Sequence, residues 1–494
     1  MALSITMLLL IGISVTVLEF LGIHERAPFQ PEEFDFPELG GGSSNSSPPD
    51  PVLIITAPMT PAIPSTASKE APDNNTETFR NRTTETFRNR TTKPPVTTTA
   101  PSGTPSIYDE AIDKQPLVCT MGDKIFTGLQ FPSDSLCDYI FFDSLYKGGR
   151  NLLTDKETYT NSLDTFLFNH RAYQRTSLGV GFAFEYLATA EKALKVRNPS
   201  PLARFWKEDI FHVGILDTPA TAVRDQMKAA IATLKAMNRL LGTLRARGNF
   251  SITALAMPQP DLWWSLIFAA DFTDIGFTPS LIITFGHYRF GDNTVQHCAV
   301  MPPTRHPDDT PPDDIARDYK FDLSTAVSSI RALLKASPNT TGLVSVTLKG
   351  RWTKPRVPDS VDFFTRCSSD PKIESFGSYT EVCPGGSSGA GARLDYSEKH
   401  YAVITYIKSK NRTFVYDDEK AFAAKLCHAK SMAPNVTFGI AVYDIDYDDF
   451  ADTCRSLNKY NRYSRLRAVK KVVESFRRQK AAFKKDDCVR YAAP

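Results

Sequence analysis

The stretch FVYDDEKAFAAKLCHAKSMAPNVTFGIAVYDIDYDDF, residues 414–450, decides the fold predicted for this chain. It holds an acidic turn at Tyr416, Asp417 and Asp418, and then a run with helical spacing that ends near Met432. An apolar and aromatic run follows, and its acids are Asp444, Asp446, Asp448 and Asp449. A helix that leads into a buried strand, with carboxylates and an aromatic at the strand end, is typical of one β/α unit of a barrel. On composition alone, an ordinary αβ unit with a solvated acidic end would fit equally well.

The order of these elements resembles the last β/α unit of glycoside hydrolase family 18, the chitinases and chitinase-like lectins. In that family a YDD turn, a helix and a strand of the form GxMxWxxDxDDF follow one another. SLGVGFAFEY (177–186) stands where the family has its KVLLSIGG strand, and GLVSVTLKGRW (342–352) is similar to its vvlGvPfYGRsW strand. The resemblance covers roughly Leu117 to Tyr460 and implies an α/β fold, a (β/α)8 TIM barrel.

Candidate strands and a helix-period segment also follow one another between these two ends. FHVGILDTP (211–219) is a candidate buried strand, and the apolar residues of the next segment, 222–248, recur three or four apart. FSITALAMPQP (250–260) and SLIITFGHYRF (280–290) are further candidate strands. A β/α barrel takes about 250 to 400 residues as one domain, which the 494 residues allow. The net charge of +3 argues against a nucleic-acid binder, which usually carries a large basic excess.

The N-terminus predicts the compartment. Residues 2–18 carry no charge and include MLLLIGISVTVL, which is long enough for the core of a signal peptide. Extended past Glu19 to Ile23, the segment is just long enough to span a bilayer. We expect residues 1–23 to be a signal peptide or a signal anchor, with the anchor slightly favoured because no clear cleavage site follows. Both alternatives place the rest outside the cell, secreted or attached as a single-pass protein, and a start inside a longer chain is a third alternative.

A stalk is predicted for residues 24–114. From about Gly40 to Ser106 the chain is rich in Pro, Thr, Ser and Asn, and the octet TETFRNRT occurs twice, at 76–83 and 84–91. Such a composition buries too little apolar surface to offset chain entropy, so we expect disorder here and a barrel over 115–494. N-glycosylation sequons occur at Asn45, Asn74, Asn81, Asn89, Asn249, Asn339, Asn411 and Asn435.

The eight cysteines all follow the stalk: Cys119, Cys137, Cys298, Cys367, Cys383, Cys427, Cys454 and Cys488. An even number in an exported chain suggests disulfides, although the spacing does not give their connectivity. No CxxC occurs, and the lone Cys427–His428 neighbours are interpreted as helix surface, so we predict no metal and no cofactor. The resemblance implies one pair, Cys119 with Cys137.

The resemblance also implies what the site lacks. Chitin-cleaving members carry D-x-x-D-x-D-x-E after the fourth strand, where Glu protonates the glycosidic oxygen and the Asp before it orients the acetamido group of the substrate. When the prolines are matched, Asp217 takes the place of the acid, Ile215 that of the orienting Asp, and Val213 that of the next acid upstream. No acid pair then remains. Asp217 is better interpreted as a helix N-cap, with Pro219 in the first turn.

A second position departs from the family in the same way. Its sixth strand carries M-x-Y-D, and the corresponding residues here include Phe285 and Gly286, which lack the hydroxyl donor and the carboxylate. Aromatics remain: Tyr443 stands at the tryptophan of the family's sugar pocket, and Trp352 follows Gly-Arg as in the family loop. Both are candidate carbohydrate-binding residues, because flat rings stack on sugars, although an aromatic near a strand end is more often core. Trp263 and Trp264, in PQPDLWW, are weaker candidates for the rim.

Other constellations give weak signals. CPGGSSGAGAR (383–393) lacks the spacing of a nucleotide-binding loop. The segment 465–485 is a basic amphipathic helix, interpreted as the closing barrel helix, with a polyanion- or lipid-binding role as the alternative. Several histidines show no Ser or Cys partner at a recognisable catalytic elbow: His287, His297, His306, His400 and His428.

The sequence therefore predicts a catalytically inactive, chitinase-like extracellular protein that binds either a chitin-type or other glycan or a protein partner. One alternative is an active family 18 chitinase with a displaced acid, for which Glu185 and Asp209 are the candidates. The other alternative is a scaffold or secreted effector that binds no sugar. Membrane contact is expected only through residues 1–23, if these are not cleaved.

Overall fold

The computed structural model of the protein describes residues 113–122, 124–154, 156–196, 198–258, 261–288, 298–319, 321–358, 361–368, 375–384, 393–479 and 483–493. The expected leader, nearly all of the expected stalk, and the sequons at Asn45, Asn74, Asn81 and Asn89 lie outside these residues. Among the helices that are described, none has the length and apolar character needed to cross a bilayer.

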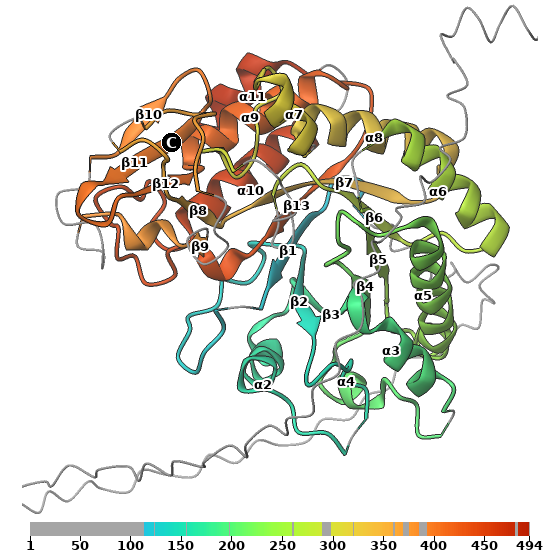
Figure 1. Cartoon of the computed structure of the whole chain (residues 1–494). Coiled ribbons are helices and arrows are strands. Elements are labelled where there is room, and N and C mark those ends of the chain that lie inside the picture. Colours follow the sequence, from blue (N-terminus) through green and yellow to red (C-terminus); the bar gives the residue numbers. More distant parts are fainter. Residues whose placement is uncertain are drawn as a thin grey trace, which may run out of the picture. The chain divides into compact units, whose positions relative to one another are not determined.

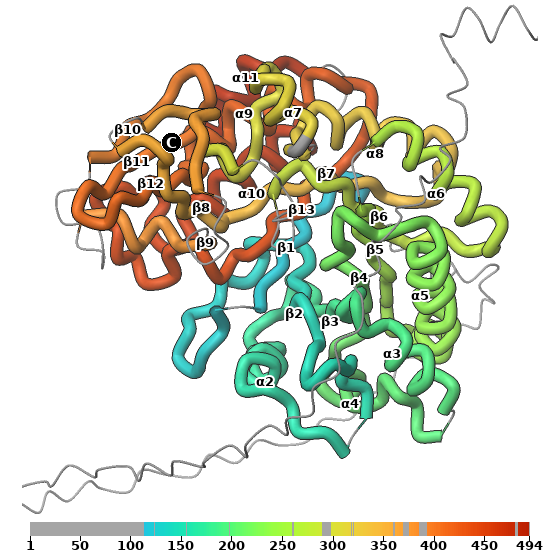
Figure 2. Tube along the Cα trace, in the orientation of Figure 1, coloured from blue at the N-terminus to red at the C-terminus, as the bar shows by residue number. Residues whose placement is uncertain are grey.

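Eight parallel strands close into a barrel in the order β1-β13-β7-β6-β5-β4-β3-β2 (Figure 1). The strands are β1 (Leu117–Met121), β2 (Tyr139–Leu145), β3 (Ser177–Phe182), β4 (His212–Ile215), β5 (Thr253–Ala256), β6 (Leu281–Thr284), β7 (Thr341–Thr347) and β13 (Gly439–Tyr443). Figure 2 shows blue β1 beside β13, although the two strands are far apart in the sequence. Leu117 of β1 pairs with Ile440 of β13, and this pairing closes the barrel. The predicted (β/α)8 fold is confirmed.

Helices surround these strands. They are α2 (Asn161–Phe168), α3 (Leu187–Leu194), α4 (Ala203–Lys207), α5 (Arg224–Arg245), α6 (Leu262–Ile275), α7 (Asp313–Asp318), α8 (Leu323–Ala336), α9 (Glu419–Ser431), α10 (Ser464–Arg478) and α11 (Lys485–Ala492). Short 3-10 turns are η1 (Asn169–Ala172), η2 (Phe184–Tyr186), η4 (Tyr379–Glu381), η5 (Lys408–Lys410) and η6 (Ile445–Tyr447).

The core has two layers, because successive side chains of a barrel strand face opposite sides. One layer lies between strands and helices and includes Ile140, Val344 and Val442 with Ile231 of α5. The other fills the barrel and includes Phe141, Leu343 and Ala441. The layer to which a strand residue belongs therefore tells which way its side chain points.

A second sheet, antiparallel and of order β10-β11-β12-β8-β9, lies to one side of the barrel (left in Figure 1). Its strands are β8 (Gly350–Thr353), β9 (Ser375–Gly377), β10 (Asp395–Ser397), β11 (Ala402–Ile407) and β12 (Arg412–Tyr416). The segment 342–352, expected as one strand, is divided between β7 and β8. This insertion between β7 and α9 was not predicted from the sequence.

The stretch that led to the barrel prediction contains the last β/α unit. Its first residues end β12, and α9 and β13 then follow in the expected order. Asp418 caps α9 by accepting a hydrogen bond from the Ala421 N–H at 2.8 Å. Asp417 forms an ion pair with Lys425 at 2.6 Å, and both side chains are fully buried. The acidic turn is therefore structural, since it fixes the start of α9.

Four disulfides connect the eight cysteines: Cys119–Cys137, Cys298–Cys367, Cys383–Cys454 and Cys427–Cys488. The first joins β1 to the segment before β2, and the last joins α9 to α11. Cys427 is thus a buried, paired residue of α9 and not helix surface.

The basic segment 465–485 is not one helix: α10 ends at Arg478, and Lys485 begins α11. The apolar side of α10, with Leu466, Val469 and Phe476, is buried against the barrel, as expected for a closing helix.

Candidate functional site

A cavity of about 360 Å³ lies at the carboxyl ends of the barrel strands, and we call it the mouth cavity. This is the end at which (β/α)8 barrels carry their functional residues, because the loops after the strands meet there. Polar or aromatic side chains from five strand ends contribute to its lining: Asp143, Ser144, Tyr146, Asp217, His287, Lys349, Tyr443 and Asp444.

Asp217 follows β4 and lines the mouth cavity. Its carboxylate accepts hydrogen bonds from the Phe184 N–H at 2.9 Å and from the Ser144 hydroxyl at 3.3 Å. It does not cap a helix, because α5 begins only at Arg224 and its N-cap residue is Val223. The N-cap interpretation of Asp217 was therefore wrong.

Matching Pro219 to the family's proline implied that Val213 and Ile215 point into the barrel, and the structure differs. Val213 and Ile215 belong to the apolar layer between strands and helices, so they face away from the barrel interior. Leu216 lies in the interior layer. By strand alternation Gly214 and His212 point the same way, and the His212 ring packs on Tyr139 of that layer.

No inward position of β4 therefore carries a carboxyl group. His212 is completely buried, which lowers its pKa to about 3 and keeps the ring neutral. Its Nδ1 accepts a hydrogen bond from the Ile252 N–H at 3.2 Å. The ring is thus part of the barrel core rather than a charged group at the mouth.

Phe285 and Gly286 follow β6. Phe285 is fully buried in the barrel interior, and its ring lies 5.4 Å from that of Tyr443. The Gly286 N–H donates to the Ser345 hydroxyl at 3.0 Å. A Cβ at Gly286 would lie 2.8 Å from Ser345 O and from Leu323 Cδ2, so the backbone here leaves no room for a side chain.

His287 lines the mouth cavity and has a serine neighbour after all. Its Nδ1 lies 2.7 Å from Ser345 Oγ of β7. Ser345 is fully buried and also accepts from Gly286, so the contact orients the imidazole rather than preparing a nucleophile. The pair could not be recognised in the sequence, because the two residues are 58 positions apart.

Of the two predicted sugar-binding aromatics, only Tyr443 lines the mouth cavity. Its hydroxyl donates to Leu216 O at 3.0 Å, which fixes the ring at the base of the mouth. Trp352 lies in β8 of the second sheet, is 5% exposed, and packs on Phe414. Its Nε1 donates to Glu381 at 3.1 Å, and Trp352 is not among the residues that line the mouth cavity.

Tyr146 is an aromatic that the sequence analysis overlooked. It follows β2, lines the mouth cavity, is 49% exposed, and stacks on Tyr186 with centroids 4.9 Å apart. An aromatic directly after a strand was the signal that could have found it. Trp263, although 70% exposed, lies in the first turn of α6, and Trp264 packs on Phe268; neither lines the mouth cavity.

The acids after Tyr443 are mostly structural. Asp446 accepts from the Gly122 and Lys124 N–H groups, Asp448 pairs with Arg465, and Asp449 accepts from Cys454 N–H. Asp444 differs because it lines the mouth cavity. It forms an ion pair with Lys349 at 2.9 Å and accepts from the Thr347 hydroxyl at 2.7 Å.

A second cavity, of about 620 Å³, is also lined by Asp217. Glu185, one of the two alternative acids, lies here beside Pro219 and Gln226. The other alternative, Asp209, precedes β4 and therefore lies at the opposite end of the strand from the mouth. Asp209 cannot serve as the displaced acid.

One group with metal-ligand spacing occurs among the described residues: His306, Asp308 and His428. None of the three lines the mouth cavity. Nothing in the sequence indicates that the two histidines meet, because 122 positions separate them.

No protein-family model matches the chain, and no curated protein does. Solved structures do share its fold. The group II chitinase catalytic domain 2 from Ostrinia furnacalis is 11% identical with a TM-score of 0.51, over 75% of this chain and 98% of that chain. The group IV chitinase of the same organism, in complex with allosamidin, is 13% identical with a TM-score of 0.51, over 73% and 99%.

A GH18 chitinase variant from Cycas revoluta, in complex with (GlcNAc)4, is 13% identical with a TM-score of 0.50, over 72% of this chain and 98% of that chain. At such identities the likeness establishes the fold alone. This chain has the barrel fold of the family 18 chitinases.

Proposed function

We propose that this protein is a chitinase-like protein that binds a chitin-type glycan at the mouth cavity without cleaving it. The observation that carries the proposal is the inward side of β4, where His212, Gly214 and Leu216 supply no carboxyl group. The cavity nevertheless keeps aromatic and polar side chains. A site of this kind favours binding over hydrolysis.

Sugar binding is supported by the lining of the cavity. Tyr146 is half exposed and held flat by Tyr186, which suits stacking on the apolar face of a sugar ring. The Lys349–Asp444 ion pair is partly exposed and offers both donors and acceptors to sugar hydroxyls. We expect weak affinity, because a cavity of about 360 Å³ contacts only a short part of an oligosaccharide.

The absence of hydrolysis is supported by the surroundings of Asp217. Substrate-assisted cleavage needs a protonated acid and a nearby carboxylate that orients the acetamido group. Asp217 instead accepts from the Phe184 N–H and the Ser144 hydroxyl, and these contacts hold its carboxylate against the residues that follow β3 and end β2. Losing one preorganised catalytic contact typically costs about 3 kcal/mol, and β4 offers no acid beside Asp217 to take that part.

The test measures binding and turnover on the full-length protein. Calorimetry with (GlcNAc)4 should give a Kd that rises severalfold in Tyr146→Ala and Tyr443→Ala. Trp263→Ala, which removes an even larger exposed aromatic ring outside the cavity, should leave the Kd unchanged. A fluorogenic chito-oligosaccharide should show no turnover above blank. Equal affinities in all four proteins would contradict the proposal.

An active hydrolase is the second candidate, because Glu185 and Asp217 both line the larger neighbouring cavity. Turnover that disappears in Glu185→Gln or Asp217→Asn would favour it. If the protein neither binds nor cleaves these sugars, the scaffold or effector alternative, with a protein partner, would replace both.

An extracellular location belongs to the same proposal. Four disulfides are typical of an oxidising compartment and agree with the apolar leader and the stalk inferred from the sequence. Among the described sequons, Asn339 and Asn435 are exposed. Treatment of the secreted protein with an N-glycosidase should lower its mass, and limited proteolysis should leave a fragment that begins close to Cys119. A protected fragment that required residues 40–100 would contradict the stalk.

A further inference from the structure

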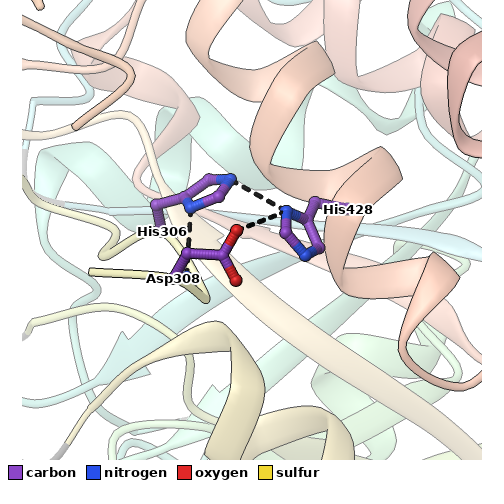
Figure 3. A group of neighbouring side chains, drawn as sticks. All are labelled: His306, Asp308 and His428. Atoms are coloured by element: carbon purple, nitrogen blue, oxygen red, sulfur yellow. Dashed lines mark hydrogen bonds and ion pairs between the residues drawn. The ribbon is translucent and has the colours of Figure 1, made fainter. Parts of the chain in front are cut away.

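Three side chains from two distant segments meet at one point outside the mouth cavity (Figure 3). His306 precedes α7, and His428 lies in α9. His306 Nε2 is 3.2 Å from His428 Nδ1, which in turn is 3.4 Å from Asp308 Oδ2. We propose that His306, Asp308 and His428 bind a divalent transition-metal cation of the Zn²⁺ class.

The spacing of the donor atoms fits such a cation. Zn²⁺ holds nitrogen and oxygen ligands at about 2.0–2.2 Å with tetrahedral angles, which places neighbouring donors roughly 3.3–3.5 Å apart. Two of the three separations, 3.2 and 3.4 Å, match this geometry, and all three donor atoms lie within 4.8 Å of one another. Two imidazoles and one carboxylate favour Zn²⁺, Cu²⁺ or Ni²⁺ over Mg²⁺ and Ca²⁺, which prefer oxygen ligands. Three protein ligands would leave one position for water.

A positive charge already lies at this point. The Lys485 ammonium group, at the start of α11, is 3.1 Å from His428 Nδ1. It contacts the same nitrogen that would hold the metal, so it acts as a stand-in for the cation. The lysine is only half-buried and its chain is long, so it can move aside. Lys485 should therefore compete with the metal.

Charged groups of both signs face the two imidazoles. Asp308 and Asp309 are negative, and Lys425 and Lys485 are positive. A metal binds the neutral imidazole, so its affinity should fall as the pH is lowered.

The proton of His306 must move when the metal binds. Its Nδ1 accepts a hydrogen bond from the Asp308 N–H at 3.1 Å, so without metal the ring proton is on Nε2 and points to His428. The cation would take the place of that proton, which would move to Nδ1, and the Asp308 N–H would give up its bond. No proton is released, and the lost hydrogen bond makes us expect moderate affinity.

The cluster rests on rigid surroundings. The His306 ring stacks on Tyr401 with centroids 4.5 Å apart, and Asp309 accepts from the His306 N–H at 3.2 Å. His428 adjoins the Cys427–Cys488 disulfide, which joins α9 to the helix that carries Lys485. A cation here would fasten the segment before α7 to α9, outside the barrel.

The test titrates the full-length protein, stripped with a chelator, with Zn²⁺ alone in a calorimeter. We expect one equivalent to bind, and Mg²⁺ not to compete. Asp308→Asn, which is exposed and keeps the backbone amide, and His428→Ala should each weaken binding by at least about tenfold. Lys485→Met should tighten binding, because the competing ammonium group is gone.

His170→Gln is the matched control, because that imidazole lies far along the chain from the cluster and contacts Leu167 O and Glu208. It should leave the Zn²⁺ affinity unchanged. Circular dichroism of the stripped proteins checks that the variants fold. Binding that survives in Asp308→Asn and His428→Ala, or that Lys485→Met weakens, would overturn the proposal.

Discussion

The carboxylate of Asp217 accepts a hydrogen bond from the backbone N–H of Phe184 at 2.9 Å, and so connects the residues that follow β4 and β3. Its other oxygen accepts from the Ser144 hydroxyl near the end of β2, at 3.3 Å. One acid thus joins three successive strand ends at the mouth of the barrel. This explains why the acid is present even though the strand before it supplies no second carboxyl group.

Asp217→Ala should lower the free energy of unfolding by about 1–2 kcal/mol, because it leaves the Phe184 N–H without its acceptor. Asp217→Asn keeps an acceptor oxygen and should lose clearly less. Denaturant unfolding of the two variants measures both values. Equal losses of unfolding free energy in Asp217→Ala and Asp217→Asn would mean that the carboxylate does not act through this hydrogen bond.

The barrel was predictable because its buried parallel strands appear in the sequence as apolar runs. GIAVY, for example, lies between an acidic cap at Asp418 and the acids after Tyr443, and that order is enough to identify a β/α unit. The second sheet was not predictable in the same way. Two of its strands have three residues each, too few for a periodic signal.

The direction in which the side chains of β4 point could not be predicted from the sequence either. A shift of one residue exchanges the two faces of a strand, and a match made on Pro219 does not fix that register. Contacts between distant positions were likewise hidden: His287 with Ser345, and His306 with His428, depend on how the barrel closes.

The Cys119–Cys137 disulfide closes a loop over a separation of 18 residues. Chain entropy predicts that the double variant Cys119→Ala/Cys137→Ala loses about 3 kcal/mol of unfolding free energy. Guanidinium denaturation without reductant measures the loss, and peptide masses under the same conditions check the pairing in the natural protein. Free thiols at both positions would contradict this disulfide.

The raised pKa of Asp446 should make the stability of the protein depend on pH. Burial, followed by the charge of Asp444, raises its pKa to about 6, above the value of about 3.9 in unfolded chains. Between these two pH values the folded protein binds more protons than the unfolded chain. The stability that protonation of Asp446 contributes is therefore complete below about pH 4 and is lost as the pH rises through 6.

Relative to the natural protein, Asp446→Asn should therefore gain stability between pH 4 and pH 7, by up to about 3 kcal/mol from a shift of about two units. The variant keeps an oxygen for the N–H groups of Gly122 and Lys124. Urea unfolding at several pH values gives the difference. A difference that is constant with pH would show that Asp446 does not titrate as its burial implies.

Gly286 and Gly242 differ in the space that a side chain would find at each position. A Cβ there would lie 2.8 Å from the backbone oxygen of Ser345 and from Leu323 Cδ2, whereas a Cβ at Gly242 of α5 would have no neighbour within 4 Å. Gly286→Ala should therefore destabilise the protein by about 1–3 kcal/mol through overpacking. Gly242→Ala should stabilise it by about 0.5–1 kcal/mol, because alanine favours a helix interior. Thermal unfolding of both variants measures the two signs.

Gly286→Asp would place a carboxylate at the position that the sequence resemblance matches to the Asp of M-x-Y-D. It should lose at least as much stability as Gly286→Ala and gain no turnover. A stable Gly286→Asp variant that cleaves a fluorogenic chito-oligosaccharide would contradict this prediction.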